Sequence, residues 1–189
     1  ALPAPLEWKS ETQVGPTLGR DAVDKARTSM LVGSLAVVLF MLLYYRRAGA
    51  IADTAVLLNL FLQLAVLATF NASMTLPGIA GLALTIGMSV DANVLINERI
   101  REELREGRSP RAAVELGFSR ALSAILDGNV TTFISAVVLA QFGTGPIKGF
   151  AITLMVGVMT NLFTGVVFSR LLFDLWVRNM SRDAKLSVG

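Results

Sequence analysis

The chain has 189 residues, of which 53% are hydrophobic and 16% charged, whereas a soluble domain is normally about a quarter charged, so the composition indicates a protein of the lipid bilayer. It contains no cysteine and no histidine, which excludes disulfides and cysteine nucleophiles and leaves carboxylates as the side chains that could titrate usefully. The net charge of +3 is small and no arginine-rich tract is interleaved with aromatic residues, so neither nucleic acid nor a cofactor is expected.

Residues 1–27 are polar and contain several prolines and glycines, which predicts an extended flank outside the membrane. The flank lacks the basic and apolar regions of a signal peptide. Because it begins with Ala1 rather than methionine, we expect the chain to be part of something longer.

Five apolar segments follow, and each is long enough to predict a membrane-spanning helix, which needs about 20 residues. The first ends in two tyrosines and two arginines, an order typical of a membrane interface. The sequence therefore predicts an all-α bundle of five transmembrane helices within residues 28–178, with spans at 28–45, 50–70, 76–96, 121–142 and 149–169.

Residues 97–120 alternate arginine with glutamate and predict a solvated helical connector in the cytoplasm. The third helix should continue into the connector and stop at Gly107, and Ser109 and Pro110 are typical of the cap and first turn of another helix. We expect that helix to lie along the membrane interface before the span at 121–142. A helical hairpin facing solvent is the alternative.

The orientation follows from the arginines and lysines of the short loops, which concentrate on the cytoplasmic side. The connector contains six arginines, whereas the loop after the fourth span contains only Lys148. This predicts a cytoplasmic connector and tail, residues 179–189, with the N-terminal flank outside. Lys25 and Arg27 in the flank oppose this assignment but are outnumbered.

The third helix carries two polar faces. Gly87 and Asp91 lie roughly opposite a stripe of polar residues at four-residue intervals, namely Thr85, Ser89, Asn93 and Asn97. An ionised carboxylate in hydrocarbon costs about 2.5–3.5 kcal/mol on insertion scales, so we expect Asp91 to be functional and to bind and release a proton. Ser89 and Asn93 suit interhelical hydrogen bonds equally well. Every arginine and lysine lies at a span end or in a loop, so a cationic partner of Asp91 would come from another polypeptide or domain.

Two further groups are candidates for a proton or water path. Asp127 is followed at four-residue steps by Thr131 and Ser135, although an ion pair between Asp127 and the arginine-rich connector is slightly favoured. In the fifth span, Thr160 and Asn161 are the residues expected to line a pathway. No nucleophile and base are paired and no phosphate loop is present, so hydrolytic activity is not expected.

Four motifs together resemble the SecD family, accessory subunits of the bacterial Sec translocon within the resistance–nodulation–division superfamily. The central motif is GMSVDANVLINER, and the others flank the first, fourth and fifth spans; the four occupy residues 14–19, 87–99, 126–132 and 142–151. The resemblance covers nearly the whole chain.

The resemblance implies half of a pseudo-symmetric SecDF membrane domain in the bacterial cytoplasmic membrane, which uses the proton gradient to promote polypeptide export. The aspartate matching Asp91 would take part in proton movement across the interface with SecF. Implied partners are SecF or a fused SecF half, the SecYEG translocon, YajC or YidC, and the exported polypeptide, which would be handled by an external domain absent here.

The sequence is also compatible with two other functions. The chain could form half of another proton-driven exporter of the same superfamily, for lipids or small molecules, because the same carboxylate would serve. It could also be a passive scaffold that holds a channel together, in which case Asp91 would have no titrating role.

Overall fold

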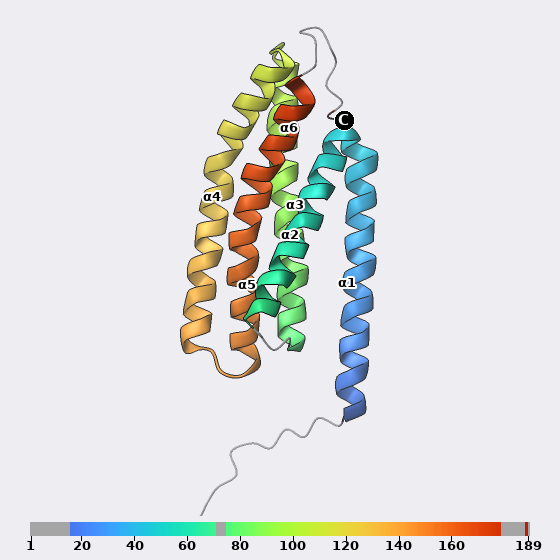
Figure 1. Ribbon diagram of the computed structural model, residues 1–189, viewed down its shortest axis with the longest axis vertical. Helices are drawn as coiled ribbons and strands as arrows, with labels where there is room; N and C mark the ends of the chain where they lie inside the picture. Colours follow the sequence, from blue (N-terminus) through green and yellow to red (C-terminus); the bar gives the residue numbers. More distant parts are fainter. Residues whose placement is uncertain (1–15, 71–74, 179–187, 189) are drawn as a thin grey trace, which may run out of the picture.

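The computed structural model describes residues 16–70, 75–178 and 188, and these residues form helices with no strand among them (Figure 1). The predicted all-α fold is confirmed, and five helices are long and apolar enough to span a membrane. The fifth is interrupted by a π-helical segment, η1. The elements are α1 (Pro16–Tyr45), α2 (Arg47–Thr69), α3 (Leu76–Arg105), α4 (Pro110–Phe142), α5 (Pro146–Leu162), η1 (Phe163–Phe168) and α6 (Ser169–Arg178).

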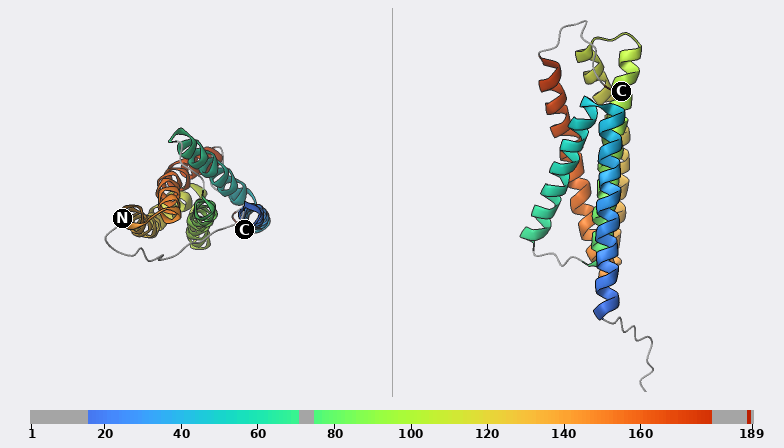
Figure 2. Two further views of the ribbon diagram at one scale, coloured as in Figure 1. Left: turned by 90° about the horizontal axis from the view of Figure 1, so that it is seen from below. Right: turned by 90° about the vertical axis from the view of Figure 1, so that its right-hand side faces the viewer.

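Helix α3 lies at the centre of the bundle, in contact with α1, α2, α4 and α5. Helix α1 stands at one side, as Figure 1 and the left view of Figure 2 show. Only 11% of the apolar window of α1 is buried, against 44% for α3. In water the exposed leucines of α1 would be a liability, but in a bilayer they face lipid at no cost. Helix α3 is therefore the central element of the bundle and α1 a peripheral one.

The structure corrects the expected N-terminal flank. Helix α1 begins at Pro16, so residues 16–27, expected to be extended, are helical, while residues 1–15 lie outside the described chain. Proline is favoured in the first turn of a helix, and the small residues Ala22 and Ala26 line a groove against α3. The tail expected at 179–189 also lies outside the described residues, except for the buried Val188.

Helices α3 and α4 form a hairpin at what we call the connector end of the bundle. The predicted stop and start are confirmed, because Gly107 adopts φ 80° after α3 and Ser109 is the extended residue before Pro110. A positive φ of this size strains any residue with a Cβ atom. Helix α4 then continues unbroken from Pro110 to Phe142 and contacts α3. The separate interfacial helix is therefore wrong, and the alternative hairpin is closer to the structure.

Several charged residues of the connector are buried or paired. The Glu103 carboxylate of α3 is fully buried and forms ion pairs with Arg120 of α4 and, at 3.9 Å, with Arg108. Removing one partner from a buried ion pair is costly because the other charge stays in a dry environment. The alternating charges therefore do more than solvate this segment, since they fasten α3 to α4.

The corner between α1 and α2 is also fixed to α3. The Tyr45 hydroxyl donates a hydrogen bond of 2.9 Å to Glu98, and Arg101 donates one of 3.1 Å to the Tyr44 hydroxyl. The hydrogen bond from Arg101 to Tyr44 raises the pKa of Arg101. These bonds set the depth of α2 relative to α3, which determines which polar residues of the two helices meet.

Candidate functional site

The two faces predicted for α3 are present in the structure. Gly87 and Asp91 are exposed on the outside of this single chain, whereas Ser89 and Asn93 are buried inside the bundle. Asp91 therefore belongs to the surface that another polypeptide or the membrane would cover. Asp91 therefore lies on the helix that contacts α1, α2, α4 and α5.

Asp91 lies in a groove of about 370 Å³ between α3 and α4. The groove is mostly apolar, and its polar members besides Asp91 are Asn129 and Thr132. Among the residues that the structure describes, no arginine or lysine forms an ion pair with Asp91. An ionised Asp91 in this groove would therefore need a partner from outside the described chain.

The buried face of α3 is hydrogen bonded to the fifth span. The Ser169 hydroxyl donates to Asn93 Oδ1 at 2.8 Å, and Asn93 Nδ2 donates to the Ser89 carbonyl at 2.8 Å. Within the described residues, the Ser89 hydroxyl and both amide atoms of Asn97 lack a hydrogen-bond partner. Asn93 thus joins two helices, which is the packing expected of this face.

A second polar layer lies nearer to the Lys148 end of the bundle and joins α2, α3 and α5. The Thr85 hydroxyl donates to Gln63 Oε1 at 2.9 Å, and Gln63 Nε2 donates to the Thr153 carbonyl at 2.9 Å. Gly157 leaves the space that this layer needs, because a Cβ atom there would overlap Thr85 and lie 2.6 Å from Gln63 Nε2. Close approach of backbones at small residues is typical of helix packing in membranes.

The structure separates Thr160 from Asn161, which were expected to line one pathway. Asn161 is buried, and its Nδ2 atom donates to Asn129 Oδ1 at 3.2 Å, which joins the fifth span to α4. The Thr160 hydroxyl bonds within its own helix, because it donates to the Val156 carbonyl at 3.1 Å. Asn129 also lines the Asp91 groove, so Asn161 is one hydrogen bond away from it.

Asp127 lies on the exposed face of α4 and does not line the Asp91 groove. It forms no ion pair with the connector within the described residues, so the favoured ion pair is not found there. The Thr131 hydroxyl donates to the Asp127 carbonyl at 2.8 Å, and the Ser135 hydroxyl donates to the Thr131 carbonyl at 2.9 Å. Such local bonds are ordinary for hydroxyls within helices.

The sequence interpretation overlooked Asp53, a carboxylate of α2. Its side chain lies inside the bundle with only 6% of the residue exposed, and neither carboxylate oxygen has a hydrogen-bond partner among the described residues. A signal was present, since Asp53 is the one charged residue in the span predicted at 50–70. Because Arg46 and Arg47 lie close to Asp53 in the sequence, Asp53 resembles a charged residue at the membrane interface.

The hydrogen bond between Ser169 and Asn93 predicts a measurable loss when it is removed. Ser169→Ala should lower the free energy of unfolding by about 0.5–1.5 kcal/mol, because Asn93 Oδ1 loses its donor in a buried environment. Thermal unfolding in detergent measures this as a lower melting temperature. Ser135→Ala is the matched control, since that hydroxyl is exposed and bonds its own helix. Equal melting temperatures for the two variants would contradict the prediction.

Comparisons with known proteins all point to one family. The family model described as protein export membrane protein SecD/SecF, C-terminal, matches residues 3–179. The chain is 57% identical over 174 residues to the protein translocase subunit SecD of Syntrophobacter fumaroxidans, covering 92% of this chain and 33% of that relative. It is 53% identical over 189 residues to SecD of Rhodothermus marinus, covering 100% of this chain and 30% of that relative.

The same fold occurs in a solved structure. The crystal structure of SecDF from Thermus thermophilus, described as a translocon-associated membrane protein, matches with a TM-score of 0.84 and 42% sequence identity. The match covers 91% of this chain and 24% of that one. The chain therefore spans about a third of the length of the SecD relatives and about a quarter of the SecDF chain.

Proposed function

The chain belongs to the SecD/SecF family of protein export membrane proteins, and from this premise we propose that it works as a membrane domain of a Sec-pathway protein translocation component. Two observations support the proposal. The family match extends over residues 3–179, and the fold agrees with the membrane part of SecDF at a TM-score of 0.84. Residues outside this chain would grip the exported polypeptide, because the chain covers only part of its relatives.

The domain uses proton movement to promote export, and Asp91 is the group that binds and releases the proton. The observation that carries this role is the position of Asp91, exposed in an apolar groove of the central helix without a cation from the described residues. Ionisable residues inside membranes are costly and usually mark ion or proton paths. Replacing Asp91 with asparagine in the complete complex tests the role, since asparagine keeps the volume and removes the titrating proton.

The partner is a SecF subunit or a fused SecF half, which covers the α3–α4 groove and supplies polar or cationic groups to Asp91. The groove contains Asp91, and the remaining length of SecDF chains is large enough to contain such a half. The neighbouring polar residues Asn129 and Thr132 then contribute the α4 side of the path. The assembled unit would bind to the Sec channel.

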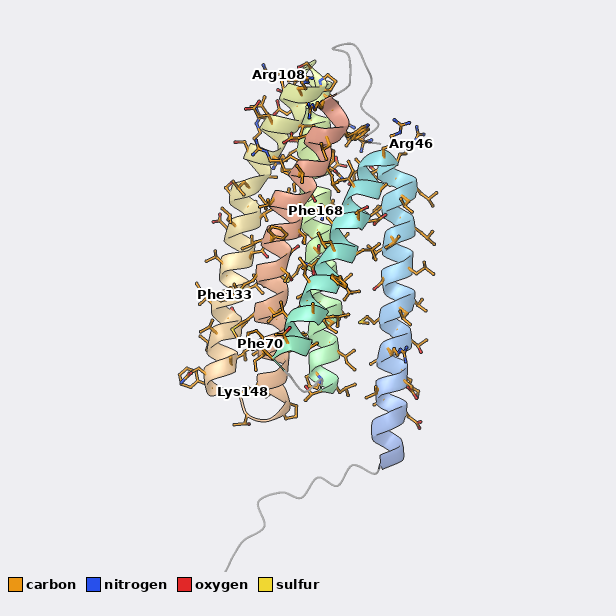
Figure 3. All side chains as sticks on the ribbon, viewed as in Figure 1. Arg46, Phe70, Arg108, Phe133, Lys148 and Phe168 are labelled. Atoms are coloured by element: carbon orange, nitrogen blue, oxygen red, sulfur yellow. The ribbon has the colours of Figure 1, made fainter. Side chains whose placement is uncertain are left out.

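The domain lies in the bacterial cytoplasmic membrane with the connector end in the cytoplasm. Figure 3 shows Arg108 at the connector end and Lys148 at the opposite end of the bundle. Arg46 also lies at the connector end, and six arginines occur within residues 97–120, on either side of the turn at Gly107. Positively charged loops concentrate in the cytoplasm, so this arrangement supports an inward-facing connector.

Cysteine labelling tests the orientation. The chain has no cysteine of its own, so Arg105→Cys and Lys148→Cys each introduce a single exposed thiol within it. In inside-out vesicles an impermeant maleimide should label the first variant, and in right-side-out vesicles the second. The full-length protein without introduced cysteines is the control. The reverse pattern would overturn the orientation and leave the fold unaffected.

A further inference from the structure

Asp53 is a buried carboxylate on the side of the bundle away from the Asp91 groove. It belongs to α2, whereas the groove lies between α3 and α4. Both Asp53 oxygens lack a hydrogen-bond partner in the described chain, and the residue is 6% exposed. A buried ionised carboxylate without a partner costs so much free energy that such a group normally becomes neutral. The Asp91 groove therefore does not explain why Asp53 is buried without a partner.

The register of α2 against α3 places Asp53 at the depth of Asn97. Helix α2 starts beside Tyr45, which bonds Glu98, and reaches Gln63 beside Thr85, so the two helices run antiparallel. Asp53 precedes Gln63 by ten residues, and both helices rise about 1.5 Å per residue. Counted from the bond between Gln63 and Thr85, Asp53 lies level with residue 95 of α3, less than one turn from Asn97.

Asn97 is the matching polar group at this depth. It is 1% exposed, and both its Oδ1 and Nδ2 atoms lack a partner among the described residues. A carboxamide offers one acceptor and donors, and a protonated carboxyl offers one donor and an acceptor. An ionised carboxylate offers acceptors only, which would leave Asn97 Oδ1 without a donor. The two orphaned side chains are thus complementary only when Asp53 holds a proton.

Charged groups on the helices packed against α2 do not reach Asp53. Each has another partner or is exposed: Tyr44, Tyr45, Glu98 and Arg101 bond one another, Asp91 lies on the outer face of α3, Lys148 is at the far end of α5, Arg170 pairs with Asp174, and Arg178 is exposed. Segment η1 has no titratable residue. On α2 itself, Arg46 and Arg47 are exposed at its start. No described cation is placed to hold Asp53 in its ionised form.

We propose that Asp53 is a second proton-binding carboxyl of this membrane domain, neutral in the resting bundle and hydrogen bonded to the carboxamide of Asn97 through a water. Proton binding here is the conversion of the carboxylate to the acid, whose O–H donates towards Asn97 Oδ1. Loss of that proton leaves an unpaired charge inside the bundle, which is costly unless water or a cation enters. The use of Asp53 in export rests on the proposed function, but proton binding by Asp53 does not.

Infrared spectroscopy of the full-length protein, reconstituted with its partner subunits at neutral pH, tests the proposal. The difference spectrum between the parent and Asp53→Asn should show one protonated carboxyl band that the variant has lost. The same band should persist in Asp91→Asn, so a failure of the Asp91 role and a failure of this proposal are distinguishable. Asp174→Asn, at an exposed ion-paired carboxylate, is the matched control and should leave the band intact.

The Asn97 contact has its own test. Asn97→Leu should shift the Asp53 carboxyl band towards the frequency of a carbonyl without a hydrogen bond. An unshifted band would overturn the pairing with Asn97. A parent spectrum that coincides with that of Asp53→Asn would overturn the neutral state. Failure of Asp53→Asn to fold would also contradict it, because asparagine can replace the neutral acid in both hydrogen bonds.

Discussion

Asp91→Asn should abolish the proton-dependent part of polypeptide export in the complete SecD–SecF complex, while expression and assembly stay normal. The substitution nearly preserves the side-chain volume, and Asp91 is exposed on the outer face of α3, so the five-helix fold loses no internal contact. The carboxamide cannot take up and release a proton at physiological pH. Export into membrane vesicles, measured with and without a proton gradient, separates the proton-dependent part from the rest.

Two variants complete this experiment. Asp91→Glu keeps a titratable carboxyl in the same groove and should retain part of the stimulation. Asp127→Asn removes an exposed carboxylate that does not line the groove and should have the smaller effect. If Asp91→Asn exports normally under a proton gradient, with the partner subunits present in normal amounts, the passive scaffold becomes the better explanation of this domain.

Gly157→Val should destabilise the bundle more than any substitution on its outer surface. A Cβ atom at this position already overlaps Thr85 and lies 2.6 Å from Gln63 Nε2, so a branched side chain would separate α5 from α2 and α3. Overpacking of a filled core costs about 1–3 kcal/mol. The same shift would break the bonds between Thr85, Gln63 and the Thr153 carbonyl. Thermal unfolding in detergent should show a clearly lower melting temperature.

Gly33→Val is the control for the change of residue type. Gly33 lies within a long helix as Gly157 does, but no atom lies within 4 Å of a Cβ placed there. Its melting temperature should stay close to that of the parent. A Gly157→Val variant as stable as Gly33→Val would show that α5 can move away from α2 without loss, and that the polar layer contributes little to stability.

Much of the fold could be predicted from the sequence because its signals are local. Apolar length identified the spans, and Gly107 followed by Ser109 and Pro110 located the hairpin turn, where the structure gives Gly107 a φ of 80°. The four-residue spacing along α3 separated the buried Ser89 and Asn93 from the exposed Asp91 without knowledge of the neighbours. Helical periodicity alone decides which side chains share a face.

Other features depend on tertiary packing and have no local signal. The burial of Asp53 depends on where α1 and α3 stand, because a charge in the second turn of a span is normally able to reach the interface. The ion pairs of Glu103 arise only when α4 lies along α3, which also explains why Glu103 is buried in a connector whose other charged residues are exposed or half-buried. The described residues supply no ion-pair partner for Asp91, so the sequence offers no local signal for one.

The π-helical segment η1 changes the direction in which side chains point between α5 and α6. An α-helix turns by about 100° per residue, so the wider turns of η1 set the stripe that α6 presents to the bundle. That stripe consists of Ser169, Phe173 and Val177, all buried. A π turn holds one residue more than an α turn, so an uninterrupted α-helix of the same sequence would present Phe168, Leu172 and Trp176 where Ser169, Phe173 and Val177 now pack. Segment η1 therefore brings the Ser169 hydroxyl to Asn93 Oδ1, at 2.8 Å.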